Sequence, residues 1–386
     1  MPRTDVVIVG AGASGLAAGA ALKRLGREPV LLDRDERVGG TWARRYERLH
    51  LHTVRRFSGL PYHGISREHP RYIPKDGFAR YLEEYAARLG LDVRLGHAVS
   101  KVRPQDGSGR WLVETDRGAW HSRAVIVATG HYNREVVPRW EGTDAFGGRL
   151  LHSIHYRSGL EFAGLRTLVI GIGNSGAEIA ADLAEQGAEH VAISVRTPPP
   201  IVPRELFGVV PVQILGILLT PVPAPGLIDR LGAVMRRLGT GDLRPYGLGK
   251  AGWGPFTARR PALIDVGFLR ELKAGRVQVR PNVRRFTAVG VEFVDGSEGD
   301  FDVVIVATGF DTGLAELLDV PGAVGEDGEP RFRSGRPTEF PGLYFMGFDE
   351  TTRGHLFEAN REARRLARAV ARYLEGYGGV PPGTAA

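Results

Sequence analysis

Two glycine-rich segments carry the residue pattern of dinucleotide binding. The first, Gly10-Ala11-Gly12-Ala13-Ser14-Gly15, follows an apolar run and opens a segment of small residues. Glycines permit a tight turn and the close approach of a diphosphate, and a helix N-terminus supplies free N–H groups and a positive dipole. Asp33 stands 18 residues after Gly15, where a carboxylate would accept hydrogen bonds from ribose hydroxyl groups. A structural glycine turn would not explain Asp33, so the pattern predicts a nucleotide site.

The second segment is Gly171-Ile172-Gly173-Asn174-Ser175-Gly176, and the residues after it differ from those after the first. The same count of 18 residues from Gly176 reaches Ser194 instead of an acid, with Arg196 two residues further on. A carboxylate there would repel a ribose 2′-phosphate, whereas Ser and Arg can bind one. This predicts NADPH at the second segment, and a nucleotide without a 2′-phosphate at the first. The alternative for Arg196 is a solvated charge at a strand end.

The nucleotide of the first segment is indicated by Gly39-Gly40-Thr41-Trp42, six residues beyond Asp33. Paired glycines let the backbone approach a flat ligand, and the Trp42 ring can lie against that ligand. The alternative is that Trp42 is an aromatic residue of the core. A later passage from strand to helix at 346–354 returns to this site, so FAD is the expected occupant. The predicted FAD contacts are Gly10, Gly12, Ser14, Gly15, Asp33, Gly40, Thr41, Trp42, Thr129 and Gly347. The predicted NADPH contacts are Gly171, Gly173, Asn174, Ser175, Gly176, Ser194 and Arg196.

Alternating strands and helices must position these residues. A strand at 5–10, a helix at 13–25 and a strand at 29–32 are followed by a helix at 77–89 and a β-meander over 102–129. The first part of this order repeats as a strand at 168–170, a helix to about Gln186 and a strand at 190–195. Two apolar strands, at 124–130 and 301–309, end in Ala-Thr-Gly. The predicted class is α/β with parallel sheets.

The order of the elements predicts two Rossmann-like dinucleotide-binding domains, with the second inserted into the first. The apolar strand at 343–348 and a closing helix follow the second Ala-Thr-Gly, so the chain returns to the first domain. We expect an FAD-binding domain at 1–156 and 297–386. We expect an NADPH-binding domain at 157–296, with a hydrophobic lid at about 203–237.

One segment, 207–228, contains no charged residue and is long enough to suggest a membrane span. It is interrupted by prolines, which remove helical hydrogen-bond donors and kink the chain; these are Pro211, Pro221, Pro223 and Pro225. We therefore expect a lid or a substrate-channel wall. A peripheral membrane contact and an oligomer contact, such as a homodimer interface, are the alternatives.

Composition excludes several classes of chemistry. The 386 residues include no Cys, which rules out disulfides, thiolate metal sites, iron–sulfur clusters and thiol nucleophiles. The net charge of +7 is scattered and accompanies no nucleic-acid-binding motif. The N-terminus runs directly into a strand without a signal peptide, so we expect a cytoplasmic protein. The pairs His50/His52 and His152/His155 lack an obvious third ligand, so no metal is expected.

A motif between the two glycine-rich segments makes the prediction more specific. Residues 146–157 read FxGxxxHxxxYR, with Phe146, Gly148, His152 and Tyr156 at the motif positions. Together with the stretches 48–61, 71–86, 195–208 and 261–279, this chain resembles the class B flavin-containing monooxygenases, and within them the YUCCA-type branch. Tyr156 favours this group over Baeyer–Villiger enzymes, which usually carry Trp there.

The resemblance implies a reaction and the roles of several residues. NADPH would reduce the flavin, and dioxygen would form a C4a-(hydro)peroxyflavin that transfers one oxygen atom to a small organic substrate. The outcome would be N- or S-oxygenation, or oxidative decarboxylation of a 2-oxo acid. The motif at 146–157 would keep the two domains in register. Many relatives place Asn beside the flavin, but residues 51–54 contain none, so His52 and Arg55 are the candidate site residues.

Arg55 stands near the position of a Lys in YUCCA-type sequences and could hold a substrate carboxylate. A structural arginine is the alternative. Two other functions stay open at this point: a cysteine-free NADPH-dependent flavoprotein reductase, and a non-catalytic nucleotide-binding sensor.

Overall fold

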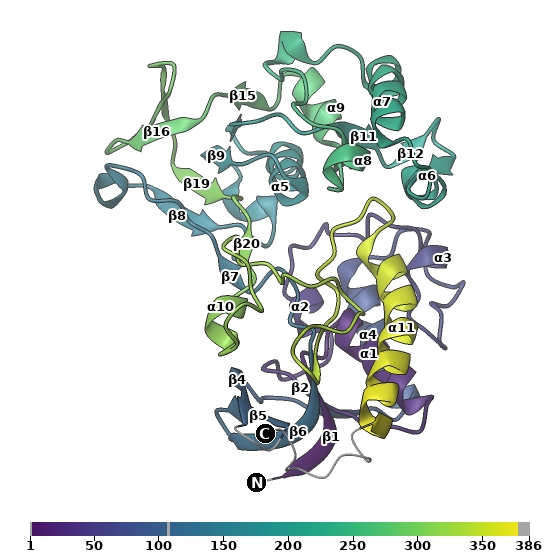
Figure 1. Cartoon of the computed structure of the whole chain (residues 1–386). Helices are drawn as coiled ribbons and strands as arrows, with labels where there is room; N and C mark the ends of the chain where they lie inside the picture. Colours follow the sequence, from purple (N-terminus) through teal and green to yellow (C-terminus); the bar gives the residue numbers. More distant parts are fainter. Residues whose placement is uncertain (1, 106–108, 377–386) are drawn as a thin grey trace.

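The computed structural model describes residues 2–105 and 109–376, and its largest sheet is formed by the two ends of the chain (Figure 1). The strand order is β3-β2-β1-β6-β5-β4, and β21 pairs with β6. The strands are β1 (Arg3–Val9), β2 (Val30–Leu32), β3 (Asp92–Arg94), β4 (Val99–Gln105), β5 (Arg110–Thr115), β6 (Gly118–Val127) and β21 (Leu343–Phe345). The parallel pairs β3-β2-β1-β6-β21 form the Rossmann-like part, and β4–β6 form the predicted meander.

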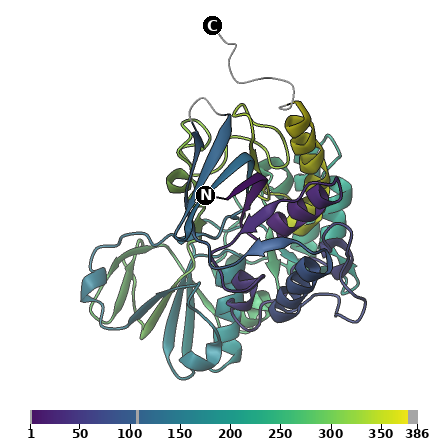
Figure 2. The same cartoon turned by 90° about the horizontal axis from the view of Figure 1, so that it is seen from below.

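Small residues let two helices pack closely on this sheet. Helix α1 (Ala13–Lys23) is rich in Ala and Gly, and a Cβ at Gly19 would lie 3.2 Å from the Leu31 side chain. The closing helix α11 (His355–Gly376) lies beside α1 in both views (Figures 1 and 2). Helix α4 (Lys75–Arg88) completes this layer. The fully buried residues Leu16, Ile126 and Phe78 lie in the core between sheet and helices.

The second sheet has the order β15-β10-β9-β19-β8, and all of its pairs are parallel. Its strands are β8 (Arg149–His152), β9 (Arg166–Ile170), β10 (His190–Ser194), β15 (Gln278–Arg280) and β19 (Val303–Val306). Helix α5 (Asn174–Glu185) packs against it, next to α9 (Phe268–Lys273). The predicted fold class, with two Rossmann-like units, is therefore confirmed.

Strand pairing does not follow the expected domain bounds of 157 and 296. Strand β8 precedes residue 157 and β19 follows residue 296, yet both pair within the second sheet. The β8 sequence hydrogen-bonds to β19, which follows it by about 150 residues, and this long-range pairing leaves no local sequence signal. The second sheet thus extends from 149 to 306.

Two connections join the two sheets, and they pair with each other. One runs from β6 to β8 and contains β7 (Arg134–Glu135); the other runs from β19 to β21 and contains β20 (Phe310–Asp311). Strands β7 and β20 form an antiparallel pair. Smaller elements complete the described chain. They are α2 (Gly40–Ala43), α3 (Arg55–Ser58), η1 (Thr143–Ala145), η2 (Gly159–Phe162), β11 (Ile201–Pro203), β12 (Glu205–Leu206), β13 (Val210–Pro211), η3 (Arg244–Tyr246), α8 (Pro255–Ala258), β14 (Leu263–Asp265), β16 (Val283–Phe286), β17 (Gly290–Phe293), β18 (Glu298–Asp300) and α10 (Leu314–Leu317).

The uncharged segment 207–228 contains one short helix and the start of a second, rather than one long helix. Helix α6 (Val212–Leu219) ends before the proline-rich turn, and α7 (Pro225–Thr240) begins at its last proline. Figure 1 shows both helices on the same side of the second domain, with α6 nearer to the first domain than α7. In the described residues, no helix has the length and apolar character required to cross a membrane.

Candidate active site

The two glycine-rich turns have the same geometry. Gly10 and Gly171 have φ angles of +104° and +107°, which disfavour any side chain. A Cβ at either position would lie 2.6 Å from a carbonyl oxygen, that of Ala128 or of Ala307. Each alanine begins an Ala-Thr-Gly sequence, so each fingerprint turn packs against the backbone at the start of one of these sequences.

The other glycines of each turn divide into two kinds. A Cβ at Gly15 or Gly176 would lie 1.9 or 2.0 Å from the carbonyl oxygen of the first glycine, so close helix–strand packing requires these two. A Cβ at Gly12 or Gly173 would meet nothing within 4 Å. Both are N-caps of their helices, α1 and α5, where N–H groups face outward. Space kept free at a helix N-terminus fits a bound diphosphate.

Asp33 is fixed in place at the end of β2. Its carboxylate accepts hydrogen bonds from the backbone N–H groups of Ala11 at 2.6 Å and Asp35 at 2.9 Å. Burial raises the pKa of Asp33, although these hydrogen bonds oppose the shift. The side chain also lines the large cavity, so its remaining lone pairs can accept ribose hydroxyl groups.

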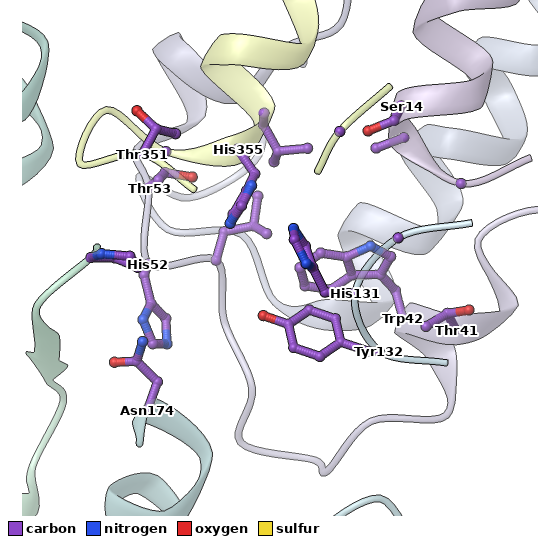
Figure 3. A pocket seen from close by; sticks show the side chains of 18 of the residues that line it. Ser14, Thr41, Trp42, His52, Thr53, His131, Tyr132, Asn174, Thr351 and His355 are labelled. Carbon is purple, nitrogen blue, oxygen red and sulfur yellow. The ribbon is translucent and has the colours of Figure 1, made fainter. Parts of the chain in front are cut away.

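A cavity of about 950 Å³ extends from the first fingerprint to the second and to the lid helices (Figure 3). Except for Gly15, every predicted FAD contact lines it. Of the predicted NADPH contacts, Asn174 and Ser175 line it. Apolar side chains of the lid form part of the wall: Val212, Leu215, Leu219, Ile228 and Leu231. One continuous space therefore joins both predicted nucleotide sites to an apolar compartment.

The part of the cavity near Trp42 contains polar groups suited to a ring with hydrogen-bonding edges. The Thr129 hydroxyl is buried without a hydrogen-bond partner. The rings of His131 and His355 lie 5.7 Å apart, and both face the cavity (Figure 3). Enclosure lowers the pKa of His355 to about 4, and the neighbouring His131 adds to this shift, so His355 is neutral at pH 7. Trp42 packs edge-on against Phe78 at 4.8 Å, which fixes its ring as a wall.

His52 pairs with an acid that the sequence did not identify. Its Nε2 lies 2.6 Å from Oε1 of Glu178, which is buried on α5. His52 belongs to the first domain and Glu178 to the second, so the pair bridges them at the cavity. Burial raises the pKa of Tyr46, and the charge of Glu178 adds to this shift. The only sequence signal for Glu178 is an acid one turn into the fingerprint helix.

Arg55 does not lie at the cavity. Its guanidinium donates to the backbone carbonyl groups of Arg67, at 2.7 Å, and of His69. It is absent from the cavity wall, so the expectation that it holds a substrate carboxylate is corrected. Its position just after the short segment that reaches the cavity directs the side chain toward the loop at 67–69 instead.

Ser194 is also directed away from the predicted phosphate. Its side chain is buried, and its hydroxyl donates to the carbonyl of Pro281 at 2.8 Å. Counting residues places Ser194 on β10 correctly, but it does not reveal that the next strand encloses this side chain. Arg196 is exposed beyond the end of β10, and its contact with a 2′-phosphate stays a prediction.

The motif at 146–157 contributes to the structure of the second domain. The Tyr156 hydroxyl is buried and donates to Asp182 on α5 at 2.6 Å. His152 accepts from the Ile154 N–H at 3.3 Å and contacts the Gly309 carbonyl oxygen at 3.1 Å through Nε2, so its ring is a neutral donor there. Burial lowers the pKa of His152. Gly148 and Phe146 complete the contact with β19, since a Cβ at Gly148 would lie 2.6 Å from the Asp302 carbonyl oxygen.

Across residues 2–105 and 109–376, no group of three or more His, Asp or Glu side chains is arranged to hold a metal ion.

Comparison with known proteins first defines a broad class. Residues 7–200, just over half of the chain, match the family described as pyridine nucleotide-disulphide oxidoreductase. Disulfide chemistry is not possible here because the chain has no Cys.

Comparison with individual proteins indicates a more specific class of protein. The chain is 37% identical over 379 residues to the indole-3-pyruvate monooxygenase YUCCA1 of Oryza sativa subsp. japonica, covering 94% of this chain and 90% of that protein. A flavin-containing monooxygenase from Stenotrophomonas maltophilia superposes with a TM-score of 0.75 at 26% identity, covering 97% and 99% of the two chains. A complex of OTEMO with FAD and NADP shares the fold, with a TM-score of 0.75 at 20% identity over 98% of this chain and 85% of that one. The protein belongs to the flavin-dependent monooxygenase family that includes the YUCCA enzymes.

Proposed function

We propose that this protein is an FAD- and NADPH-dependent monooxygenase that transfers one oxygen atom of O2 to a small organic substrate. The observation that carries the proposal concerns two glycines, Gly12 and Gly173. Each lies at a helix N-terminus, and a Cβ added there would meet no protein atom within 4 Å. One cavity joins the neighbourhoods of these two turns. FAD belongs to the first turn with Asp33, and NADPH to the second with Arg196.

When bound, the flavin supplies the redox chemistry: it accepts a hydride from NADPH and activates dioxygen. The protein supplies position and environment. Asp33 and the α1 N-terminus hold the FAD ribose and diphosphate, and the N-terminus of α11 at His355 adds a positive dipole end at the cavity. The apolar inner faces of α6 and α7 exclude water, which favours oxygen transfer over loss of peroxide.

The His52–Glu178 pair has a positioning role in this scheme. A buried carboxylate at 2.6 Å fixes the ring orientation of His52 and favours a proton on its Nε2. The other ring nitrogen is then a hydrogen-bond acceptor. Because the pair crosses the domain boundary, it also holds the second fingerprint helix against the first domain.

The substrate class follows from the relatives and from the cavity. The plant relatives are named as indole-3-pyruvate monooxygenases. We infer that an aromatic 2-oxo acid undergoing oxidative decarboxylation fits the apolar lid compartment, with amines and sulfides as the competing substrates. A cytoplasmic location, and a membrane contact or a homodimer through 207–228, stay predictions.

The test is to purify the protein and follow its cofactors and its oxygen chemistry. We expect a yellow protein that releases FAD on denaturation, is reduced faster by NADPH than by NADH, and incorporates oxygen from labelled O2 into product. In the Arg196→Ala variant, the preference for NADPH should fall by at least tenfold, because one charge-assisted contact with the 2′-phosphate is lost. A colourless protein that cannot be reconstituted with FAD would overturn the proposal. Substrate-independent reduction of an added acceptor, with no label in any product, would identify a reductase.

A further inference from the structure

One arginine side chain, Arg45, lies in the cavity wall beside two aromatic rings that contact each other edge-on, with their centroids 5.2 Å apart. Its guanidinium carbon is 5.2 Å from the ring centroid of Tyr132 and 5.2 Å from that of Phe310. Both rings line the cavity with Arg45, and Figure 3 shows the Tyr132 ring projecting into it. Tyr132 belongs to the connection that follows β6, and Phe310 to the connection that follows β19. Arg45 therefore lies where the two connections between the domains meet.

The charge of Arg45 has no anionic partner in the described part of the chain. The neighbouring Arg44 forms an ion pair with Asp35 at 2.7 Å, and Arg157 donates to backbone carbonyl groups at 2.6 and 3.0 Å. For Arg45 the structure shows ring contacts and no ion pair. Burial lowers the pKa of Arg45; Tyr132 and Tyr46 oppose this shift, and the charges of Arg157 and Arg44 add to it. A guanidinium that has lost part of its hydration is stabilised only when an anion or other acceptor replaces the water.

We propose that Arg45 is an oxyanion-binding residue, which holds a carboxylate or phosphate group of a ligand in the cavity. The planar guanidinium can give two parallel N–H donors to such a group, and its contacts with the Tyr132 and Phe310 rings help to hold it in the cavity wall. The two sources of an oxyanion in the proposed reaction are the diphosphate of NADPH and the carboxylate of an acidic substrate. The assignment rests on the proposed function, because it requires the cavity to receive these ligands.

The position of Arg45 gives the site a second property. Its ring partners come from the two connections, so an anion bound at Arg45 stabilises the arrangement in which both rings are in contact with the same cation. A charged ligand bound at Arg45 would therefore stabilise the contact between the two connections that join the domains. Arg55, which the sequence suggested for a substrate carboxylate, is not in this place.

The test uses the FAD-loaded enzyme and its Arg45→Gln, Arg45→Lys and Arg44→Gln variants. Binding of NADP⁺, phenylacetate and phenylacetamide is followed by the change in flavin absorbance. If the oxyanion is a phosphate, Arg45→Gln should weaken NADP⁺ binding at least tenfold. If it is a carboxylate, the same variant should weaken phenylacetate binding at least tenfold and leave phenylacetamide within twofold. Arg44→Gln is the matched control, because Asp35 already neutralises that charge, and it should change neither.

Unchanged affinities for both NADP⁺ and phenylacetate in Arg45→Gln would overturn the proposal. An equal loss of affinity for phenylacetate and phenylacetamide, with no loss for NADP⁺, would also overturn it. That result would show that the substitution changes the packing of the cavity rather than the binding of a negative charge. If Arg45→Gln does not retain FAD, Arg45→Lys decides: it keeps the charge but not the planar pair of donors, and affinities equal to the parent would again refute the assignment. Failure of the parent protein to bind FAD or oxidise NADPH would instead overturn the proposed function.

Discussion

Replacing Gly12 by alanine tests whether this glycine is required for FAD binding or for the stability of the fold. The added methyl group would meet no protein atom within 4 Å, and the backbone angles of φ −72° and ψ −175° are open to any residue. Alanine reduces the entropy of the unfolded chain, which stabilises by about 0.4–1 kcal/mol. Alanine is also a poorer N-cap than glycine, which costs a similar amount, on the order of 1 kcal/mol. We therefore expect the stability of the apoprotein to change by less than about 1 kcal/mol.

The effect on FAD should be much larger, because the methyl group occupies the space left for the diphosphate. Inserting a methyl group into a packed contact costs about 1–3 kcal/mol. That range corresponds to roughly a 5- to 150-fold increase in the dissociation constant. FAD affinity is measured by adding FAD to the apoprotein and monitoring the quenching of flavin fluorescence. The stability of the apoprotein is measured in parallel by thermal unfolding.

Gly173 provides a matched control at the second turn, where a Cβ also meets nothing within 4 Å. Gly173→Ala should leave FAD affinity unchanged and weaken NADP⁺ binding by a similar factor. Gly15→Ala should instead destabilise the fold, since its Cβ would lie 1.9 Å from the Gly10 carbonyl oxygen. If Gly12→Ala and Gly173→Ala both bound their nucleotides as the parent does, the open Cβ directions would not mark diphosphate sites, and this reasoning would be refuted.

Two further predictions concern stability. Burial raises the pKa of Glu362 to about 7, above the ordinary value of 4.5. The folded state then binds this proton more tightly than the unfolded state, so the contribution of Glu362 to stability is fully present below pH 4.5 and is lost as pH rises through 7, by about 3 kcal/mol in total. Glu362→Gln should remove most of this dependence in thermal unfolding across pH 4.5–8, and an unchanged slope would contradict it. Tyr156→Phe leaves the buried Asp182 without its 2.6 Å donor, so we expect a loss of about 1–3 kcal/mol in thermal unfolding with FAD content unchanged. A variant as stable as the parent would show that this hydrogen bond contributes little.

The sequence was sufficient for features determined by neighbouring residues. Gly10 and Gly15 are required by a turn a few residues long, so their spacing alone predicts the strand, the helix and the nucleotide site. Asp33 was predictable for the same reason, since it ends the next strand. Features that depend on distant pairing were not predictable: β8 joins the second sheet through β19, and Glu178 reaches His52 across the domain boundary.

The direction of individual side chains was the other feature that could not be predicted from the sequence. Ser194 lies on the predicted strand, but the enclosing strand β15 and the carbonyl at Pro281 take up its hydroxyl. Arg45 and Arg55 are ten residues apart in a segment without regular pattern, and the sequence does not indicate which of them turns toward the cavity. Three-dimensional packing decides this, since the rings beside Arg45 come from residues 132 and 310.

The paired connections β7 and β20 restrict how the two domains can move. A single linker would allow one domain to twist, tilt and slide relative to the other. Here two segments run antiparallel in register, with Glu135 opposite Phe310 and Arg134 opposite Asp311, and Arg134 also forms an ion pair with Asp311 at 3.0 Å. Because the two segments are paired in register, twisting or sliding one domain against the other would strain or break these contacts. The paired connections would therefore limit the positions from which a nucleotide held by the second domain can reach the first domain.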